Sequence, residues 1–202
     1  MKKLYLALLC GLLIGCQGKD VSLFNAAQAG NVKSVQKLIT GGANVNFNEG
    51  NGWTPLMIAA AEDHADVVKV LLENGAHPNA QNQYGRTALH YATNYTLEPI
   101  VKLLLDYGAD PTIKTYQNFG EEPEPETAFD AALRIFVPQF QRSNEEKQAA
   151  YNILKMFAHK TEKMDELHLG LCLALANYYK DKDFANYLIG KGAKRLPPQR
   201  AK

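Results

Sequence analysis

Short apolar runs recur along the chain at a fixed spacing. The run Val35–Ile39 returns as Val68–Leu72 and again as Val101–Leu105, and each step is 33 residues. Apolar positions three and four residues apart within a run predict a short helix with one buried face. A unit of this size cannot cover its own apolar face, so the constant period predicts a stack of similar helical units that share one core.

The residues between the runs predict how each unit turns. Thr54 and Thr87 lie 33 residues apart and can each cap a first helix, and Pro55 suits the first helical position. The pairs Asn51-Gly52 and Tyr84-Gly85 mark the turn of an extended finger. A glycine in the left-handed conformation can end each second helix, and the pairs that supply it are Gly42-Ala43, Gly75-Ala76 and Gly108-Ala109.

The blocks Thr54-Pro55-Leu56-Met57 and Thr87-Ala88-Leu89-His90, together with the closing Gly-Ala pairs, resemble the ankyrin repeat. The resemblance implies an all-α fold, an ankyrin-repeat solenoid of about five helix-turn-helix units with hairpin fingers. It also implies that His90 is structural and bonds with the neighbouring Thr hydroxyl and the backbone. We expect an ankyrin-repeat domain over residues 22–194, with repeats at about 21–50, 51–83, 84–116, 127–162 (with insertions) and 167–194, and a flexible tail over 195–202.

Some positions depart from the family's pattern. Thr96 stands where the family prefers glycine, and because a β-branched residue disfavours positive φ, we expect an irregular loop between the helices of that unit. Thr161 stands at the closing glycine of the fourth unit. In the fifth unit Lys180, Lys182 and Lys191 predict a solvated C-terminal cap.

The first sixteen residues form a separate pattern. A cationic start is followed by an apolar run, Leu4–Ile14, that is too short to span a bilayer, so residues 1–15 are predicted to be a signal peptide. The segment Leu13–Cys16 resembles the lipobox of bacterial lipoproteins, which implies lipidation at Cys16 and a tether over residues 16–21. Gln17 after this cysteine favours the outer membrane, facing the periplasm, over the inner membrane. The alternative is a plain secretory signal in which the cysteine is incidental.

The amino-acid composition and the lack of catalytic motifs argue against several classes of function. The chain has 202 residues, 46% hydrophobic and 21% charged, which is ordinary for a globular protein. Its net charge of +1 argues against a nucleic-acid partner. The five histidines lack the spacing of metal ligands, and the sequence has no nucleotide, haem or hydrolase motif. We therefore expect no enzyme, no cofactor and no metal, and we expect Cys172 to be a buried apolar residue.

The resemblance implies that a partner protein binds the concave side, at the finger tips and the exposed face of each first helix. Trp, Tyr and Arg dominate interface hot spots, and several of these positions carry them. The acidic residues around Pro123 are predicted to project and to meet a basic partner surface, or else to form a solvated loop. Some of the rings could instead pack between fingers. The candidate partner-binding residues are Asn51, Trp53, Ile58, Gln83, Tyr84, Arg86, Tyr91, Tyr95, Tyr116, Phe119, Glu121, Glu122 and Glu124.

Together these patterns predict a lipid-anchored, periplasm-facing protein-binding module that is a monomer when free. Ankyrin lipoproteins of this kind resemble immunity proteins of toxins delivered by type VI secretion. The resemblance implies a module that binds and neutralises an envelope-targeting toxin such as a phospholipase. The alternatives are an accessory protein for oxidative-stress defence, related to haem or catalase, and an envelope scaffold.

Overall fold

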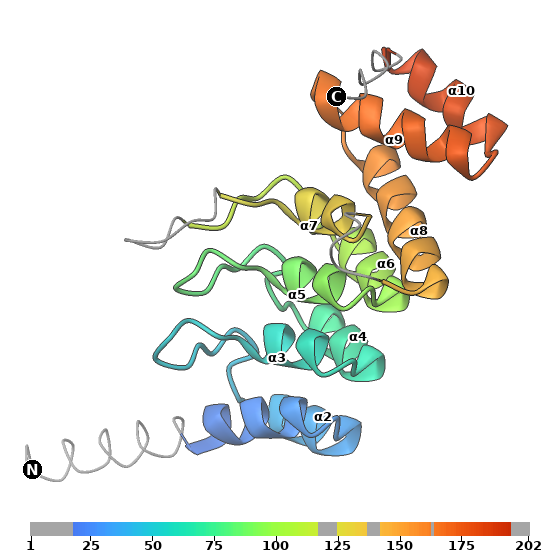
Figure 1. Ribbon diagram of the computed structural model, residues 1–202. Coiled ribbons are helices and arrows are strands. Elements are labelled where there is room, and N and C mark those ends of the chain that lie inside the picture. The colour runs from blue at the N-terminus through green and yellow to red at the C-terminus, as the bar shows by residue number, and fades with distance from the viewer. Residues whose placement is uncertain (1–17, 117–124, 137–141, 163, 195–202) are drawn as a thin grey trace, which may run out of the picture. The chain divides into compact units, whose positions relative to one another are not determined.

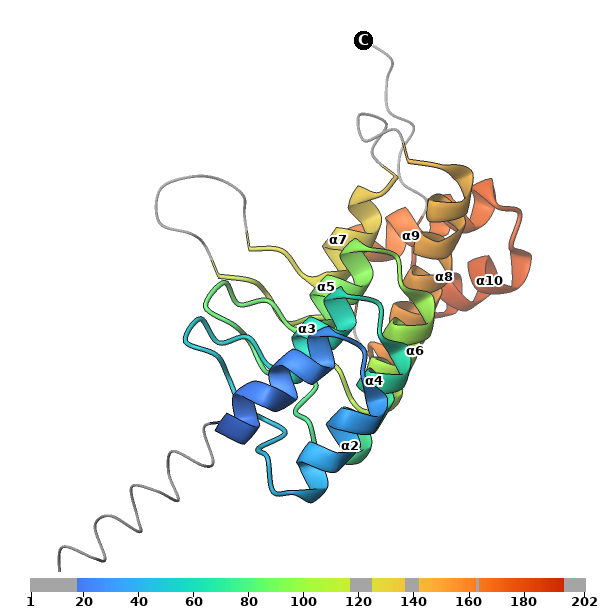
Figure 2. The same cartoon turned by 90° about the horizontal axis from the view of Figure 1, so that it is seen from below.

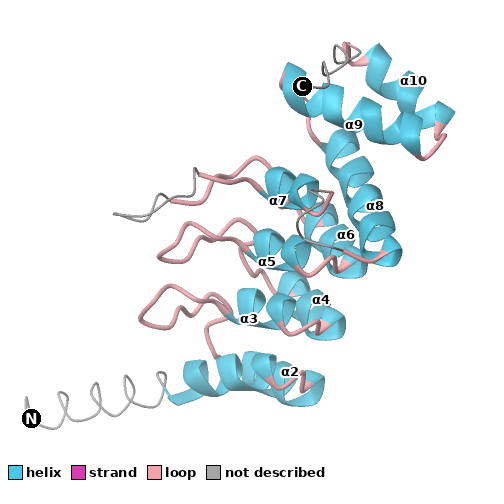
Figure 3. Ribbon diagram, viewed as in Figure 1, coloured by secondary structure: helices cyan, strands magenta, loops and turns pink. Residues whose placement is uncertain are grey.

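The computed structural model describes residues 18–116, 125–136, 142–162 and 164–194, and the regular elements in these ranges are helices (Figures 1 and 3). The predicted signal peptide, Cys16 and the tail lie outside them. The chain divides into two compact units, residues 1–131 and 132–202, which we call the repeat unit and the C-terminal unit. Among the described residues, no helix has both the length and the apolar character needed to cross a membrane.

The repeat unit is a stack of helix pairs. A helix over residues 18–28 pairs with α2 (Val32–Thr40), α3 (Pro55–Ala61) pairs with α4 (Ala65–Glu73), and α5 (Ala88–Asn94) pairs with α6 (Glu98–Asp106). The first helices α3 and α5 pack together, as do the second helices α2, α4 and α6 in succession (Figure 1). α7 (Ala128–Arg134) follows the next finger and crosses the boundary between the units. The all-α repeat architecture that the sequence predicts is therefore confirmed.

The 33-residue period builds the core of this stack. Val35, Val68 and Val101 occupy the same position in α2, α4 and α6, and all three side chains are fully buried. Each burial removes an apolar side chain from water, a gain of about 1.5–3 kcal/mol. The predicted tether overlaps this stack, because residues 18–21 already belong to the first helix.

Left-handed residues end the helices at regular positions. Gly42, Gly75 and Gly108 follow the second helices with φ of 85°, 84° and 85°. A second left-handed residue lies twelve positions before each of them, between the two helices of a pair. This residue is Gly30, Asp63 or Thr96, with φ of 67°, 58° and 55°.

The expectation of an irregular loop at Thr96 is wrong. The amide of Leu97 donates to the Ala92 carbonyl (2.9 Å), as the amide of His64 donates to Ala59 one repeat earlier (2.9 Å). These bonds close the helix end and hold Thr96 at positive φ despite its branched side chain. The tertiary repeat therefore overrides the local preference of the residue.

A pair of asparagines links successive repeats, and it was not among the features predicted from the sequence. The side chain of Asn46 donates to the Gly75 carbonyl (3.0 Å) and accepts from the His77 amide (2.8 Å). Asn79 makes the same two bonds to Gly108 and Asp110. The 33-residue spacing of Asn46 and Asn79 was the available signal.

The C-terminal unit contains α8 (Asn144–Lys160), α9 (Glu166–Tyr178) and α10 (Lys182–Gly190). Its core includes Phe157, Leu154 and Leu188, which are fully buried. Between α9 and α10, Lys180 has φ of 58°, and Gly192 follows twelve residues later with φ of 99°. The α9–α10 pair therefore ends its helices as the pairs of the repeat unit do.

Lys191 corrects part of the predicted solvated cap. Its ammonium group donates to the carbonyls of Ala158 (2.9 Å) and Thr161, at the C-terminal end of α8. The Tyr187 hydroxyl donates to the same Ala158 carbonyl (2.9 Å). Lys180 and Lys182 are exposed as predicted.

Candidate protein-binding face

The fingers of the repeat unit are hairpins, as the sequence predicts (Figure 2). In the second finger the Glu49 amide donates to the Trp53 carbonyl (2.9 Å), and in the third the Asn82 amide donates to the Arg86 carbonyl (3.0 Å). Their tips turn at Gly52 and Gly85, with φ of 83° and 72°. The described part of the fourth finger closes through a bridge between residues 114 and 127.

Backbone hydrogen bonds join one finger to the next. The Gln83 amide donates to the Asn51 carbonyl (3.0 Å), and the Tyr116 amide donates to the Tyr84 carbonyl (2.9 Å). A Cβ atom added at Gly85 would lie 2.4 Å from the Tyr116 nitrogen, so this approach requires glycine. Hydrogen bonds therefore join the second finger, the third finger and the described part of the fourth into one continuous surface.

Two tyrosines are exposed on the surface that the fingers form. The side chains of Tyr84 and Tyr116 are 42% and 54% exposed, and Gln83 beside Tyr84 is also exposed. Their backbones are fixed by the bonds between fingers, so their rings are presented from an ordered base. We call the surface formed by Asn51, Trp53, Gln83, Tyr84, Arg86 and Tyr116 the finger face.

Two of the predicted partner-binding residues are not exposed as expected. Ile58 and Tyr91 are each only 8% exposed. Tyr91 packs on the half-buried Trp53 with ring centroids 4.5 Å apart, and burial raises the pKa of its hydroxyl. This pair agrees with the alternative of rings that pack between fingers, and Trp53 presents only part of its surface on the finger face.

Tyr95 is exposed but lies elsewhere. It follows α5 at the end away from the fingers, and a helix of seven residues is about 10 Å long. It belongs to the first-helix side of the repeat unit, as predicted, but not to the finger face. Phe119, Glu121, Glu122 and Glu124 lie outside the described residues.

Asn82 is a positioning residue that was not among those predicted from the sequence. Its side chain is almost fully buried, and its oxygen accepts from the amides of Tyr84 (3.0 Å) and Arg86 (3.1 Å). Its amide group donates to the Tyr91 hydroxyl (2.8 Å). Asparagine two residues before a turn amide is a common turn device, and this was the available signal. Asn82 therefore ties the tip that carries Tyr84 to helix α5.

His90 fixes the base of the third and fourth fingers. Its Nδ1 accepts from the Thr87 amide (3.1 Å), so the neutral ring carries its proton on Nε2 and donates to the Glu126 carbonyl (3.2 Å). Burial lowers the pKa of this imidazole, which favours the neutral form. Its predicted structural role is confirmed. In the next unit Asp130 accepts from the Thr127 amide (2.9 Å) in the same way.

The finger face carries side chains that form non-covalent contacts. It offers phenol rings, amide groups and the guanidinium of Arg86, whose central carbon lies 6.0 Å from the Tyr91 ring centroid. Over the described ranges, His, Cys, Asp and Glu do not gather into a group of three or more that could hold a metal ion. Cys172 is buried, as predicted, and burial raises the pKa of its thiol to about 12.

Stacked helix pairs with a hydrogen-bonded row of fingers define a helical-repeat protein that works through its surface. Residues 23–115 match the family model described as ankyrin repeats (3 copies), so this segment of the chain is similar to three ankyrin repeats. A segment of 67 residues is 40% identical to the mitochondrial disaggregases of Bos taurus and Homo sapiens. It covers 31% of this chain and 10% of each disaggregase, so the chain spans about a tenth of the length of these curated relatives.

Ankyrin repeats are typically non-catalytic modules for protein–protein interaction, and the match indicates such an interaction module over residues 23–115. The match includes the second and third fingers, and therefore includes most of the finger face. It ends before α7, so the repeat-like ends of α9 and α10 are a finding of the structure.

Proposed function

We propose that the protein is a lipid-anchored, periplasm-facing module whose finger face binds a partner protein. The observation that carries the proposal is the exposure of Tyr84 and Tyr116 on fingers that are joined by backbone hydrogen bonds. Aromatic side chains bring large contact areas to an interface. A base that is already ordered reduces the entropy lost on binding.

The sequence pattern around Cys16 supports the anchor. A cationic start, a short apolar run and a lipobox-like Leu13–Cys16 precede the fold, and the first helix includes Gly18, two residues after the cysteine. A lipid on Cys16 would therefore hold the repeat unit close to the membrane surface. Gln17 supports the outer membrane as its location.

The specific partner that we propose is a toxin that attacks the cell envelope, for example a phospholipase. A binding module fixed at the membrane would meet such a toxin where it acts, and contact with the finger face would cover its active site or its path to lipid. The protein would then be an immunity protein. Its family's non-catalytic mode of binding supports neutralisation by occlusion.

Capture of the tagged protein from detergent-solubilised envelopes tests the binding face. The double variant Tyr84→Ala/Tyr116→Ala should lose the partner. Tyr107→Ala is the matched control, because Tyr107 is as exposed as Tyr84 but follows the second helix α6. All variants should keep the helical circular dichroism of the wild type. Equal capture by the double variant would show that the finger face is not the binding site.

The nature of the captured material tests the partner. One toxin at equal stoichiometry supports the immunity protein, whereas a haem spectrum or a catalase would indicate an accessory role in oxidative-stress defence. Several envelope subunits together would indicate a scaffold. Cys16→Ser should release the protein from membranes, and a variant that stays bound would refute the anchor.

A further inference from the structure

Charge is unevenly distributed along the repeat unit. Residues 18–48 contain three lysines and one acidic residue, Asp20. Residues 49–116 contain four lysines and arginines and eight acidic residues. The Asp20 carboxylate accepts from the Asn44 amide (2.7 Å), so it is engaged within the fold. One end of the repeat unit is therefore basic, while the remainder of the described stack is acidic.

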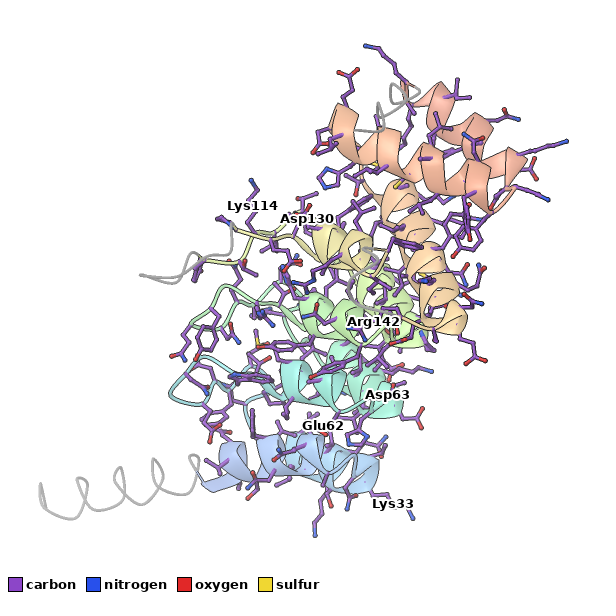
Figure 4. All side chains as sticks on the ribbon, viewed as in Figure 1. Lys33, Glu62, Asp63, Lys114, Asp130 and Arg142 are labelled. Atoms are coloured by element: carbon purple, nitrogen blue, oxygen red, sulfur yellow. The ribbon has the colours of Figure 1, made fainter. Side chains whose placement is uncertain are left out.

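Two of the three lysines lie on α2, and the third, Lys19, lies on the neighbouring helix and reaches the end of α2. Lys33 and Lys37 are four residues apart on α2, so they share a face, and both are exposed. The ammonium group of Lys19 donates to the Gly41 carbonyl (2.9 Å), immediately after α2 ends. Figure 4 shows Lys33 projecting from the N-terminal end of the stack. We call the surface formed by Lys19, Lys33 and Lys37 the basic face.

The neighbouring helix carries one acidic residue, Asp20, so the three lysines leave this end with a net charge of +2. On the helix over residues 18–28, the exposed side chains include Val21, Ser22 and Asn25, which are all uncharged. The two fingers of residues 44–53 and 77–86 project sideways from the stack in Figure 1, so they do not cover the basic face. A flat partner could therefore contact the basic face while the finger face stays accessible.

We propose that the basic face contacts anionic lipid headgroups. A lysine close to an anionic membrane gains about 1 kcal/mol, and the attraction falls off within a Debye length of about 8 Å. Three lysines give a weak contact by themselves. The inference rests on the proposed function in one respect: a lipid at Cys16 makes the contact intramolecular, and weak contacts are effective under that condition. The acidic remainder is repelled by the same surface, so the charges orient the repeat unit with its N-terminal end on the membrane.

Vesicle sedimentation tests the basic face without the anchor. The probe is the mature chain, residues 16–202 with Cys16→Ser, mixed at low salt with vesicles of phosphatidylcholine alone or with half phosphatidylglycerol. The wild-type fold should bind the anionic vesicles more strongly. Lys33→Glu/Lys37→Glu should lower that partition coefficient about tenfold or more.

Two matched variants control for net charge. Lys69→Glu/Lys102→Glu makes the same change of charge at exposed positions of α4 and α6 and should lower binding less than threefold. Lys180→Glu/Lys182→Glu makes it in the C-terminal unit and should behave like this control. The proposal is overturned if either control loses as much binding as Lys33→Glu/Lys37→Glu, or if wild-type binding does not depend on anionic lipid.

Amine labelling of the lipidated protein in anionic vesicles tests the orientation. Lys33 and Lys37 should react several-fold more slowly than Lys69 and Lys102, and the difference should disappear in detergent. Equal reaction rates on vesicles would overturn the basic face while leaving the anchor intact. Failure of the anchor would be seen in a different experiment, because the full-length Cys16→Ser variant would then stay bound to membranes.

Discussion

Helix α8 of the C-terminal unit ends by different means from the second helices of the repeat unit, although α9 and α10 end as the repeat helices do. In the repeat unit, α4 is followed by Gly75 at positive φ, and the Ala76 amide then donates to the Leu71 carbonyl (3.0 Å). In the C-terminal unit, α8 ends at Thr161 with an extended backbone, and Lys191 supplies the donor that the turn lacks. The same unpaired carbonyls are thus satisfied by a backbone conformation in one region and by a distant side chain in the other.

The two units also differ in the contacts that their buried side chains make. The repeat unit buries aliphatic residues at equivalent positions, as at Val35, Val68 and Val101. In the C-terminal unit, Tyr151 stacks on Tyr179 with ring centroids 4.4 Å apart and also donates to Asp181 (3.2 Å). Lys155 pairs with that carboxylate (2.7 Å) and holds the pKa of Asp181 below its usual range. Contacts that repeat every 33 residues therefore recur in the first region, whereas the Tyr151–Asp181–Lys155 contacts of the second occur once among its described residues.

The largest effect that we predict concerns a glycine of the repeat unit. Gly85→Ala places a side chain at φ of 72° and 2.4 Å from the Tyr116 nitrogen, so the third and fourth fingers must separate. The free energy of unfolding should fall by about 3 kcal/mol, from strain and overlap together. Urea denaturation measures this loss, and hydrogen exchange of the Tyr116 amide should accelerate.

Gly108→Ala is the matched control for that change. Its φ of 85° is equally unfavourable for alanine, but the added Cβ would meet no atom within 4 Å. It should cost only about 1 kcal/mol, from backbone strain alone. Equal losses in the two variants would show that the approach of the fingers contributes nothing to stability.

The second prediction concerns the side-chain closure of α8. Lys191→Met keeps an unbranched side chain but removes the donor to the Ala158 and Thr161 carbonyls. Because Lys191 is only half-buried, water replaces part of this interaction, and the loss should be about 1–1.5 kcal/mol. Thermal and urea unfolding would measure it. The exposed Lys182→Met should change stability by less than 0.5 kcal/mol in either direction, roughly the range of surface substitutions.

This contrast explains what the sequence could predict. Glycines and a repeated spacing are local signals, so Gly75 and the period of Val35, Val68 and Val101 predict the stack. The bond from Lys191 to α8 joins residues about thirty positions apart, and no local pattern indicates it. The finger face was predicted in part. The exposed Tyr84 and the buried Tyr91 lie in the same repeat, and the contacts that bury Tyr91, with Trp53 and with the side chain of Asn82, do not follow from residue type.

The third prediction uses a position that differs between two repeats. His90 occupies the position of Met57 one repeat earlier, and burial lowers its folded pKa below the unfolded value of 6.5. As the pH falls below about 6.5, the imidazole of the unfolded chain binds a proton that it does not bind in the folded chain. The free energy of unfolding therefore decreases. Wild type should therefore lose more unfolding free energy between pH 7 and pH 5 than His90→Met does. At pH 7 the variant should cost about 1 kcal/mol for its missing hydrogen bonds. Parallel pH profiles would contradict the assignment.

The smallest effect should come from the left-handed residues between paired helices. Thr96 and Lys180 have φ of 55° and 58°, one in each region, but only threonine is branched at Cβ. Thr96→Gly should raise the unfolding free energy by about 0.5 kcal/mol, because it relieves the backbone strain at this position. Two smaller costs oppose this gain: the extra freedom of glycine in the unfolded chain, and the loss of the hydrogen bond from the Thr96 hydroxyl to the Tyr95 carbonyl. Lys180→Gly should give no gain, because the unbranched lysine carries less strain. Urea denaturation of both variants measures the difference, and a gain at Lys180 alone would mean that the branched side chain is not the source of strain.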